Sequence, residues 1–426
     1  MTKETKQHCS FCGIEASASV PMIAGAEGHI CEACVVLASQ VVSSWGKKKA
    51  LSDMPQDLPK PTEIKKLLDQ YVIGQDLAKE ILAVAVYNHY KRLKHESTKT
   101  AGLGVADQSV EIGKSNILLV GPSGTGKTLL ASTLAKIVGV PFAVADATTI
   151  TQAGYVGDDV ENILVRLLDV ANGDISKAEW GIVYIDEVDK IARSPEQAIG
   201  TRDVSGEGVQ QALLRLVEGS QVKVPLKGRR REQSGGNESV IVDTRNILFI
   251  SGGAFPSLEK HVEKRLMPSH ISIGFHAEMK PSEKPKLEEL LNATQPDDLK
   301  KFGLIPEFIG RFPVLAPLEP LDVEALIKVL TEPKNALVKQ YKQLFAYDDV
   351  ELEFTEDALS EIAEQAIEHN TGARGLRGIM EKVLRRIMFD IPSRENVERC
   401  IVNADVIKGE QEVEIIEREE SEQATQ

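Results

Sequence analysis

The segment from Gly121 to Thr128 (GPSGTGKT) restricts what this chain can fold into more than any other feature. It has the pattern G-x-x-x-x-G-K-[ST], whose glycines let backbone N–H groups turn toward phosphate oxygens. An apolar run from Asn116 to Val120 precedes it, and a helical pattern from Lys127 to Val138 follows. A phosphate-binding loop needs this order of strand, loop and helix, because the helix N-terminus adds partial positive charge. The segment therefore predicts a nucleotide-binding domain.

A second apolar run, Ile182 to Ile185, ends in two carboxylates, Asp186 and Glu187. In a nucleotide site of this class, Asp186 can lie in the Mg²⁺ coordination sphere and Glu187 beside the attacking water. Strands commonly end in charged loops, so the pair alone would be a weak signal. Together with the phosphate-binding loop it predicts hydrolysis of ATP rather than binding alone.

The organisation of the chain indicates an α/β fold. Three short apolar runs, of which the third is Ile247 to Ile250, alternate with helical segments such as Val160 to Ala171 and Gly206 to Glu218. This alternation predicts a P-loop NTPase core, a parallel sheet flanked by helices. From Leu321 onward the sequence is mainly helical, with one alternating run from Val350 to Phe354. We expect a separate, mainly helical C-terminal domain there.

Composition excludes several classes of protein. The 426 residues are 42% hydrophobic and 27% charged, which is typical of a soluble globular protein, and no apolar run is long enough for a membrane span. The N-terminus has no apolar core of the kind that a signal peptide needs, which favours the cytoplasm. The net charge of −14 argues against a protein that coats nucleic acid.

Four of the five cysteines lie near the N-terminus as two C-x2-C pairs. Cys9 with Cys12 and Cys31 with Cys34 have the spacing of a four-thiolate zinc site. A closed shell of four thiolates predicts a structural Zn²⁺ ion, without which so short a segment would hardly fold. The alternatives are redox dithiols, or His8 as a substitute ligand. Cys400 lies far from these four and is expected to be a buried apolar residue.

Further motifs occur in one order along the chain: Gly154-Tyr155-Val156-Gly157, the run Arg202 to Gly208 (RDVSGEG) and Gly372-Ala373-Arg374. Together with the cysteine module and the phosphate-binding loop, they closely resemble the ClpX family of AAA+ unfoldases, which feed proteins into the ClpP peptidase. The resemblance covers nearly the whole chain. It implies an ATP-driven unfoldase that forms a homohexameric ring around an axial pore.

The resemblance also implies the sites that contact protein. Tyr155 and its neighbours Gly154, Val156 and Gly157 match the loop that grips substrate in the pore, and an aromatic ring between glycines is a mobile contact surface. The run 202–208 matches a second pore loop. Ile273, Gly274 and Phe275 match the tripeptide that docks on ClpP. By themselves, these segments would be an ordinary turn and ordinary core residues.

Two arginines complete the expected ATP site. Arg311 matches the arginine finger that reaches the nucleotide of a neighbouring subunit, and Arg374 matches the sensor arginine of the small domain; a guanidinium stays charged and binds phosphate as a fork. On sequence alone, either could be a surface ion pair. The residues expected to contact ATP are Val72, Ile73, Gly121, Pro122, Ser123, Gly124, Thr125, Gly126, Lys127, Thr128, Leu129 and Arg374.

The chain departs from the family pattern in two places. Arg229, Arg230 and Arg231 stand where the family often has Arg-Lys-His, so the pore entrance stays basic but its selectivity for tagged substrates is open. After the third apolar run, Ser251-Gly252-Gly253 offers no sensor of the Asn or Thr type, and none is assigned. The stretches 95–113 and 261–295 differ from the family pattern, and the first reads as a polar loop.

The expected domains are a zinc-binding domain (1–45), a linker (46–61), a large ATPase domain (62–318), a small C-terminal domain (319–415) and an acidic tail (416–426). Three alternatives are kept. A nucleic-acid motor on the same core would need basic and aromatic DNA-contacting loops, for which 229–231 is the one candidate. An HslU-type unfoldase would lack the four-cysteine module, and a zinc-dependent adaptor with an inactive ATPase would not need the intact ATP-site residues.

Overall fold

The structure is a computed structural model, and it describes residues 8–17, 20–25, 28–39, 58–100, 110, 112–150, 160–193, 206–225, 239–267, 285–394 and 396–418, with the backbone alone for 97–100. The chain divides into two units, residues 1–57 with 93–110 and residues 58–92 with 111–426. Within these described ranges, no helix is both long and apolar enough to cross a membrane.

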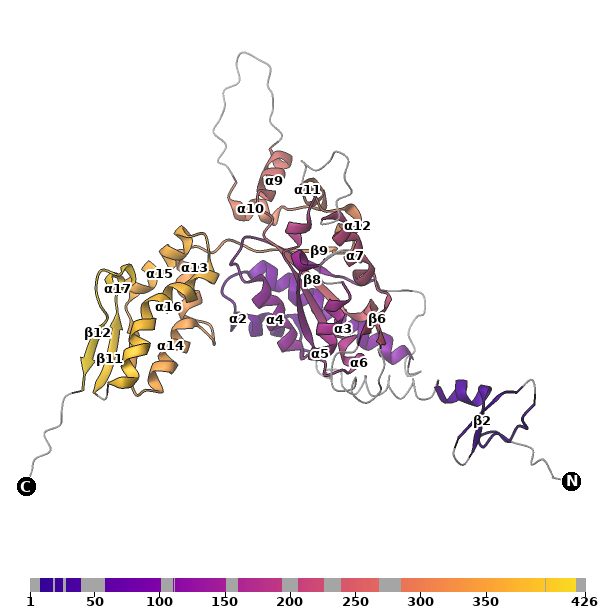
Figure 1. The fold of residues 1–426 in the computed structure, drawn as a ribbon. Helices are drawn as coiled ribbons and strands as arrows, with labels where there is room; N and C mark the ends of the chain where they lie inside the picture. The colour runs from indigo at the N-terminus through magenta and orange to yellow at the C-terminus, as the bar shows by residue number, and fades with distance from the viewer. Residues whose placement is uncertain are drawn as a thin grey trace, which may run out of the picture. The chain divides into compact units, whose positions relative to one another are not determined.

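A five-stranded parallel sheet forms the centre of the second unit (Figure 1). This sheet confirms the predicted α/β class. The residues of its inner strands are buried, except for Asp186 at the end of β5, as the apolar runs predicted, because helices cover both faces of such a sheet. In sheet order the strands are β4 (Phe142–Asp146), β5 (Ile182–Asp186), β8 (Leu248–Gly253), β3 (Ile117–Val120) and β9 (Val314–Pro317).

The two edge strands were not predicted. In β4 the exposed side chain of Val144 interrupts the buried positions, and β9 is only partly buried and ends in Pro317. Edge strands have one free side, so they need not be continuous apolar runs, and proline is tolerated there.

The helices of this part largely follow the predicted segments. One expectation was wrong: residues 95–100 do not belong to a loop, because α3 continues through them to Thr100. The sequence there has no glycine or proline before Gly102, so nothing in it ends the helix. The helices are α2 (Pro61–Asp69), α3 (Asp76–Thr100), α4 (Lys127–Val138), α5 (Asn162–Val170), α6 (Ile175–Ala178), α7 (Glu207–Val217), α9 (Leu258–Leu266), α10 (Leu287–Asn292), α11 (Pro296–Phe302) and α12 (Pro306–Gly310).

Short elements complete this part of the chain. The strands β6 (Gln221–Pro225) and β7 (Ser239–Asp243) pair as an antiparallel ribbon. Three 3₁₀ turns, η1 (Ala147–Thr149), η2 (Val188–Ile191) and η4 (Thr244–Asn246), follow strands or precede them. Of these, η2 comes directly after the Asp186-Glu187 pair and so lies beside the candidate site.

The C-terminal part packs four longer helices and one short one against a small sheet with its own core, which includes Ile362, Leu376 and Cys400. Cys400 is fully buried in that core. The sheet was only partly predicted, and β12 extends past the expected boundary at residue 415. The elements are α13 (Val323–Thr331), α14 (Leu337–Ala346), β10 (Glu351–Phe354), α15 (Glu356–Glu368), α16 (Ala373–Asp390), η5 (Ile391–Ser393), β11 (Val397–Val402), α17 (Ala404–Lys408) and β12 (Glu414–Glu417).

The N-terminal module is small. Two antiparallel strands, β1 (Met22–Ala24) and β2 (His29–Cys31), are followed by a helix over residues 32–39. Cys9 and Cys31 are its two buried apolar residues within the described ranges. So small a core cannot stabilise a fold by apolar burial alone, which agrees with a metal-dependent module.

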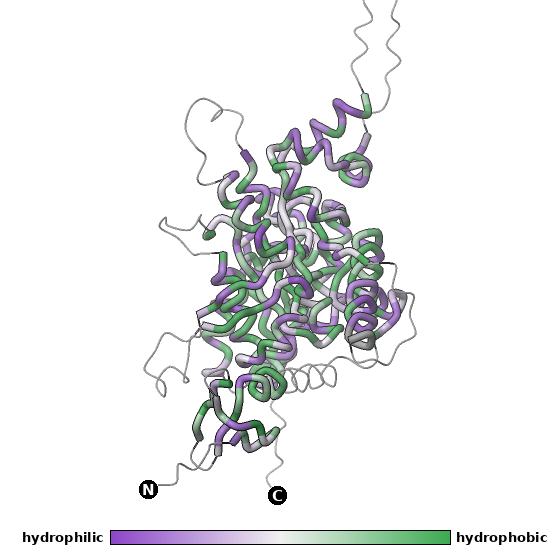
Figure 2. Tube along the Cα trace, turned by 90° about the vertical axis from the view of Figure 1, so that its right-hand side faces the viewer, coloured by the Kyte–Doolittle hydropathy of each residue, from purple (hydrophilic) through white to green (hydrophobic). Residues whose placement is uncertain are grey.

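The hydropathy along the chain follows this architecture (Figure 2). Hydrophobic residues gather in the interior of this part of the chain, and one buried cluster there has Phe249 and Phe308 among its largest members. Asn116 is one of the polar side chains buried in the interior, and it is 2% exposed. Its Nδ2 donates to Arg311 O at 2.9 Å, and its Oδ1 accepts from Phe249 N at 3.2 Å.

Asn116→Ala is expected to destabilise the protein, because it leaves the buried Phe249 N–H and Arg311 carbonyl without these partners. The expected loss in the free energy of unfolding is about 2 kcal/mol. Urea denaturation followed by circular dichroism measures it. Asn292→Ala, at an exposed position in α10, is the control and should change stability by less than about 0.5 kcal/mol. Equal midpoints for the two variants would contradict the assigned role of Asn116.

Candidate functional site

The loop between β3 and α4 has the conformation that phosphate binding requires. Gly126 is the N-cap of α4 in a left-handed conformation, so the first turn of the helix points its N–H groups into the loop. Lys127 is 6% exposed, and its Nζ donates to Gly121 O at 2.7 Å and Pro122 O at 2.8 Å. The ammonium group therefore lies across the loop, held by carbonyl groups that a phosphate can replace as partners.

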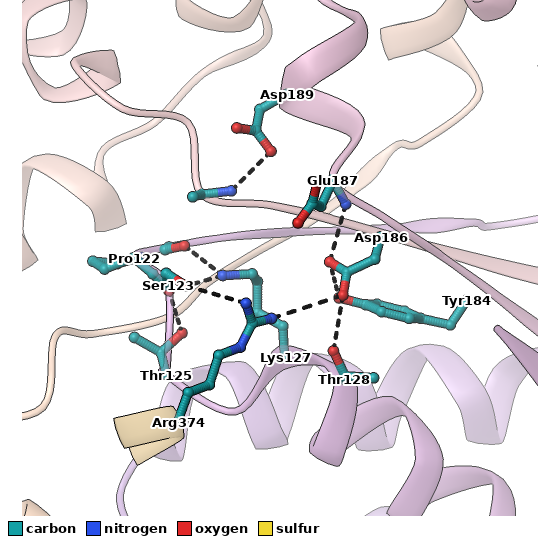
Figure 3. A network of polar contacts seen from close by, with 12 residues as sticks. Pro122, Ser123, Thr125, Lys127, Thr128, Tyr184, Asp186, Glu187, Asp189 and Arg374 are labelled. Atoms are coloured by element: carbon teal, nitrogen blue, oxygen red, sulfur yellow. Dashed lines mark hydrogen bonds and ion pairs between the residues drawn. The ribbon is translucent and has the colours of Figure 1, made fainter. Parts of the chain in front are cut away.

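Asp186 and Thr128 lie together at the carboxyl edge of the sheet (Figure 3). The Thr128 hydroxyl donates to Asp186 Oδ2 at 3.1 Å. The other oxygen, Oδ1, accepts from the Tyr184 hydroxyl at 3.1 Å and from Glu187 N at 3.0 Å. A hydroxyl and a carboxylate side by side are oxygen ligands of the kind that Mg²⁺ takes in nucleotide sites, so the donor set fits that ion.

Glu187 follows Asp186 in a backbone conformation that L-residues seldom adopt, with φ of 58°. It caps η2, and within the described ranges its carboxylate has no hydrogen-bond partner. A non-glycine residue at positive φ costs of order 1 kcal/mol and is common at functional sites. The turn thereby separates the two carboxylates: Asp186 lies against Thr128, whereas Glu187 makes no such bond to the described residues.

The C-terminal part contributes directly to this site. Arg374 lies in the first turn of α16, and its Nη1 donates to Ser123 Oγ at 3.3 Å while Nη2 lies 4.0 Å from Asp186 Oδ2 (Figure 3). The backbone also meets the loop, since Ala373 N donates to Gly124 O at 3.3 Å. Gly124 has φ of +80°, and a Cβ there would lie 2.6 Å from Thr371 O. Only glycine allows the loop and α16 to approach so closely.

The segment between α2 and α3 joins the same two parts. Val72 is buried, Ile73 is half-buried, and the Val72 carbonyl accepts from Lys79 Nζ at 2.7 Å. Gln75 is 3% exposed and forms two hydrogen bonds of 2.8 Å with the Glu319 backbone, one through each end of its amide. This segment is therefore fixed to the start of the C-terminal part.

Arg311 does not contact the phosphate-binding loop of its own chain. Its guanidinium forms an ion pair with Glu218, with Nη2 at 2.7 Å and Nε at 3.0 Å from Oε1. Both side chains are exposed. The structure thus places Arg311 outside the phosphate-binding loop of its own subunit.

Several predicted site residues lie outside the described residues: Gly154, Tyr155, Val156 and Gly157; Arg229, Arg230 and Arg231; and Ile273, Gly274 and Phe275. The same holds for residues 202–205 of the second predicted pore loop. The expected acidic tail is described only to Arg418.

Sequence reasoning missed two polar residues that lie close to the site. Tyr184 lies in the predicted buried strand and is fully buried, but no site role was predicted for it, although alternation along the strand puts it on the same side as Asp186. Asp189 is 6% exposed, and its Oδ1 accepts from Ala254 N at 3.1 Å, which ties η2 to the end of β8. No local pattern distinguishes Asp189 from an ordinary surface carboxylate, because its partner is far away in sequence.

The four N-terminal cysteines form a cluster whose sulfur atoms all lie within 4.8 Å of one another. Cys12 Sγ and Cys31 Sγ are 3.6 Å apart, close to the separation of about 3.8 Å that tetrahedral Zn–S bonds of 2.3 Å impose. Burial opposes ionisation of Cys9, but backbone N–H groups, led by Cys12 and Cys31, lower the pKa of this thiol to about 6. Four sulfur atoms this close together fit the ligand shell of a structural zinc ion.

Comparison with known proteins covers all three parts of the chain. Residues 113–315 match the family described as AAA domain (Cdc48 subfamily), residues 321–403 the C-terminal D2-small domain of ClpB protein, and residues 7–44 the ClpX C4-type zinc finger. A ClpX subunit of Methylococcus capsulatus, "ATP-dependent Clp protease ATP-binding subunit ClpX 3", is 66% identical over 97% of this chain and 95% of its own length. The ClpX of Azotobacter vinelandii is 57% identical over 95% of this chain and 90% of its own.

The binding of ATP is expected to weaken above pH 8. Burial, followed by the charge of Arg374, lowers the pKa of Lys127 to about 8, whereas a bound phosphate favours the charged form and raises it. Above that pH the free protein must take up a proton to bind ATP, so affinity falls by up to about tenfold per pH unit. The terminal phosphates are fully ionised in this range and do not contribute.

Titration of a fluorescent ATP analogue between pH 7 and 9.5 measures this dependence. Lys127→Ala is the control: it should bind weakly at every pH, with no change above pH 8. A wild-type affinity that stays constant above pH 8 would show that Lys127 remains charged in the free protein.

Zinc content is expected to depend on the N-terminal cysteines alone. The wild-type chain should hold about one ion, and Cys12→Ala should lower the zinc affinity at least about tenfold, because a ligand is lost from a closed shell. Acidification should release zinc, since protons compete for the thiolates. A chromogenic chelator measures both effects. Cys400→Ala, which removes the buried thiol of the C-terminal core, should behave as wild type, and loss of zinc there would contradict the site.

Proposed function

This chain belongs to the ClpX family of Clp protease ATP-binding subunits, and on that premise we propose that it is an unfoldase that pulls proteins through the pore of a homohexameric ring. Membership of the family makes the chain an ATPase with a zinc-binding module. The proposal adds the mechanical work, the ring and the delivery of unfolded substrates to the ClpP peptidase.

One observation carries the proposal: the ATP site is built from two parts of the chain. Arg374 of α16 and the loop residue Ser123 meet beside Asp186, so a nucleotide bound there contacts both parts at once. Hydrolysis and release of phosphate then change the contacts that hold α16 against the loop. A change in the angle between the two parts is the expected mechanical output of such a site.

The residues around the loop have complementary roles in this proposal. Val72 and Ile73 contact the adenine, and the loop with Lys127 binds the phosphates. Thr128 and Asp186 hold Mg²⁺, which neutralises charge on the phosphates. Glu187 accepts a proton from the attacking water as its oxygen bonds to the γ-phosphorus and the bond to ADP breaks. Arg311 leaves Glu218 and reaches the nucleotide of the neighbouring subunit, where it stabilises the transferred charge.

The surfaces that contact proteins follow from the family resemblance. Tyr155 grips the substrate within the pore, and residues 229–231 attract acidic or carboxylate-bearing tags to its entrance. Ile273, Gly274 and Phe275 dock on ClpP. The net charge of −14 and the zinc-finger match at residues 7–44 favour this function over a nucleic-acid motor and over an HslU-type unfoldase.

The first experiment compares ATP turnover with and without an unfolded, tag-bearing protein, in the wild type and in Tyr155→Ala. We expect the protein to change the rate of turnover. The variant should still hydrolyse ATP but unfold the tagged protein about fivefold more slowly, because loss of one aromatic contact is worth about 1 kcal/mol.

Tyr347→Ala, at an exposed tyrosine of the C-terminal part, is the matched control and should unfold the tagged protein normally. If the rate of ATP turnover does not change with added protein but changes with added DNA, the chain is still an ATPase, and the result favours a nucleic-acid motor.

A further inference from the structure

A buried amide, Gln210, connects three segments that lie far apart in the sequence. Gln210 is in α7 and is fully buried. Its Nε2 donates to Ile191 O at 2.7 Å, and its Oε1 accepts from Ile305 N at 2.8 Å. Both ends of one side chain are thus occupied by backbone groups of two other segments. A buried amide and its partners are costly to separate, because each group left without a partner costs about 1–3 kcal/mol.

Each of the three segments leads to a residue of the proposed mechanism. Ile191 is the last residue of η2, the turn that begins directly after Glu187. Ile305 is the N-cap of α12, whose C-cap is Arg311. The helix α7 itself begins at Glu207, within the last residues of the run 202–208 that matches the second pore loop. Gln210 is therefore the side chain that contacts the catalytic turn, the arginine-finger helix and the helix of the pore loop.

A second set of contacts holds the same three segments together. Arg193, just beyond η2, donates its backbone N–H to Gly303 O at 3.0 Å and forms an ion pair with Glu207 at the start of α7. Gly303 has φ of +123°, and a Cβ there would lie 2.5 Å from Arg193 O. Because the backbones are in such close contact, the three segments can shift together but hardly one by one.

We propose that Gln210 is a positioning residue that makes the turn after Glu187, the Arg311 helix and the base of the second pore loop move as one body. This inference rests on the proposed function, since it assigns the route by which the ATP site and the pore affect each other. It gives the ATP site a physical connection to the pore through packed and hydrogen-bonded groups, rather than through proximity alone.

Gln210→Leu removes both hydrogen bonds at nearly constant volume. We expect protein-stimulated ATP turnover to fall about tenfold in kcat, while the KM for ATP stays within about twofold, because nothing in the phosphate-binding loop changes. Gln211→Leu is the matched control. That neighbouring side chain is exposed, and its one hydrogen bond to the described residues is with Glu207, so its loss should leave turnover as in the wild type.

Gln210→Glu separates positioning from general stability. A neutral carboxyl can still donate to Ile191 O and accept from Ile305 N, whereas a carboxylate can only accept. Burial raises the pKa of a carboxyl group above its usual range. The turnover of this variant relative to wild type should therefore be near one at about pH 6 and fall as the pH rises toward about 9. The control Gln211→Leu keeps glutamine at position 210. Because glutamine does not titrate, the turnover of this variant relative to wild type should stay constant over the same pH range.

The outcomes distinguish this inference from the proposed function. If protein does not stimulate the wild type, the proposed function fails. The pH-dependent ratio is then read on basal ATP turnover, which needs Glu187 and Arg311 in place but does not need substrate in the pore. A constant ratio for Gln210→Glu over the whole pH range, with Gln210→Leu as active as Gln211→Leu, overturns the inference. Thermal denaturation of each variant, run at the same pH values, confirms that the turnover of folded protein is compared.

Discussion

Parallel pairing of β3 and β5 with β8 between them is the constraint on which the ATP site depends. Because the three strands run in one direction and in register, the loop after Val120 and the carboxylate of Asp186 emerge at one edge of the sheet. The hydrogen bond from Thr128 to Asp186 is a consequence of this register. Edge strands and covering helices support the arrangement but do not create it, and the unusual backbone of Glu187 is tolerated because the strand before it is fully buried.

A second feature of the structure is that several distant segments meet through hydrogen bonds to backbone groups. Gln75 bonds to the backbone of Glu319, Gln210 to Ile191 and Ile305, and α16 approaches the loop at Gly124. Contacts of this kind depend on shape and on correct placement of the chain more than on charge. They are therefore little affected by ionic strength, unlike the exposed ion pairs of the surface.

These contacts also explain how much could be read from the sequence. The loop, the Asp186-Glu187 pair and the cysteine pairs were predictable, because each is a local pattern in which neighbouring residues serve one purpose. The alternating run 350–354 predicted β10, but β11, β12 and the edge strand β4 were not predictable, since partly buried strands such as FAVAD have no continuous apolar signal. The burial and the contacts of Gln210 could not be predicted from the sequence, for a different reason. Its partners lie 19 and 95 residues away, and a glutamine in a helical pattern carries no mark of burial.

The pair formed by Arg311 and Glu218 affects how a ring could assemble. An exposed ion pair is worth about 1 kcal/mol or less, so a subunit keeps this arginine docked at little energetic cost and can release it as easily. In the proposed ring, assembly would then replace the weak Arg311–Glu218 pair by the contact of Arg311 with the neighbouring nucleotide, and no unpaired cation would lose its hydration. Glu218 would thereby act as a resting partner for Arg311: leaving the ion pair costs little free energy, and returning to it gains little.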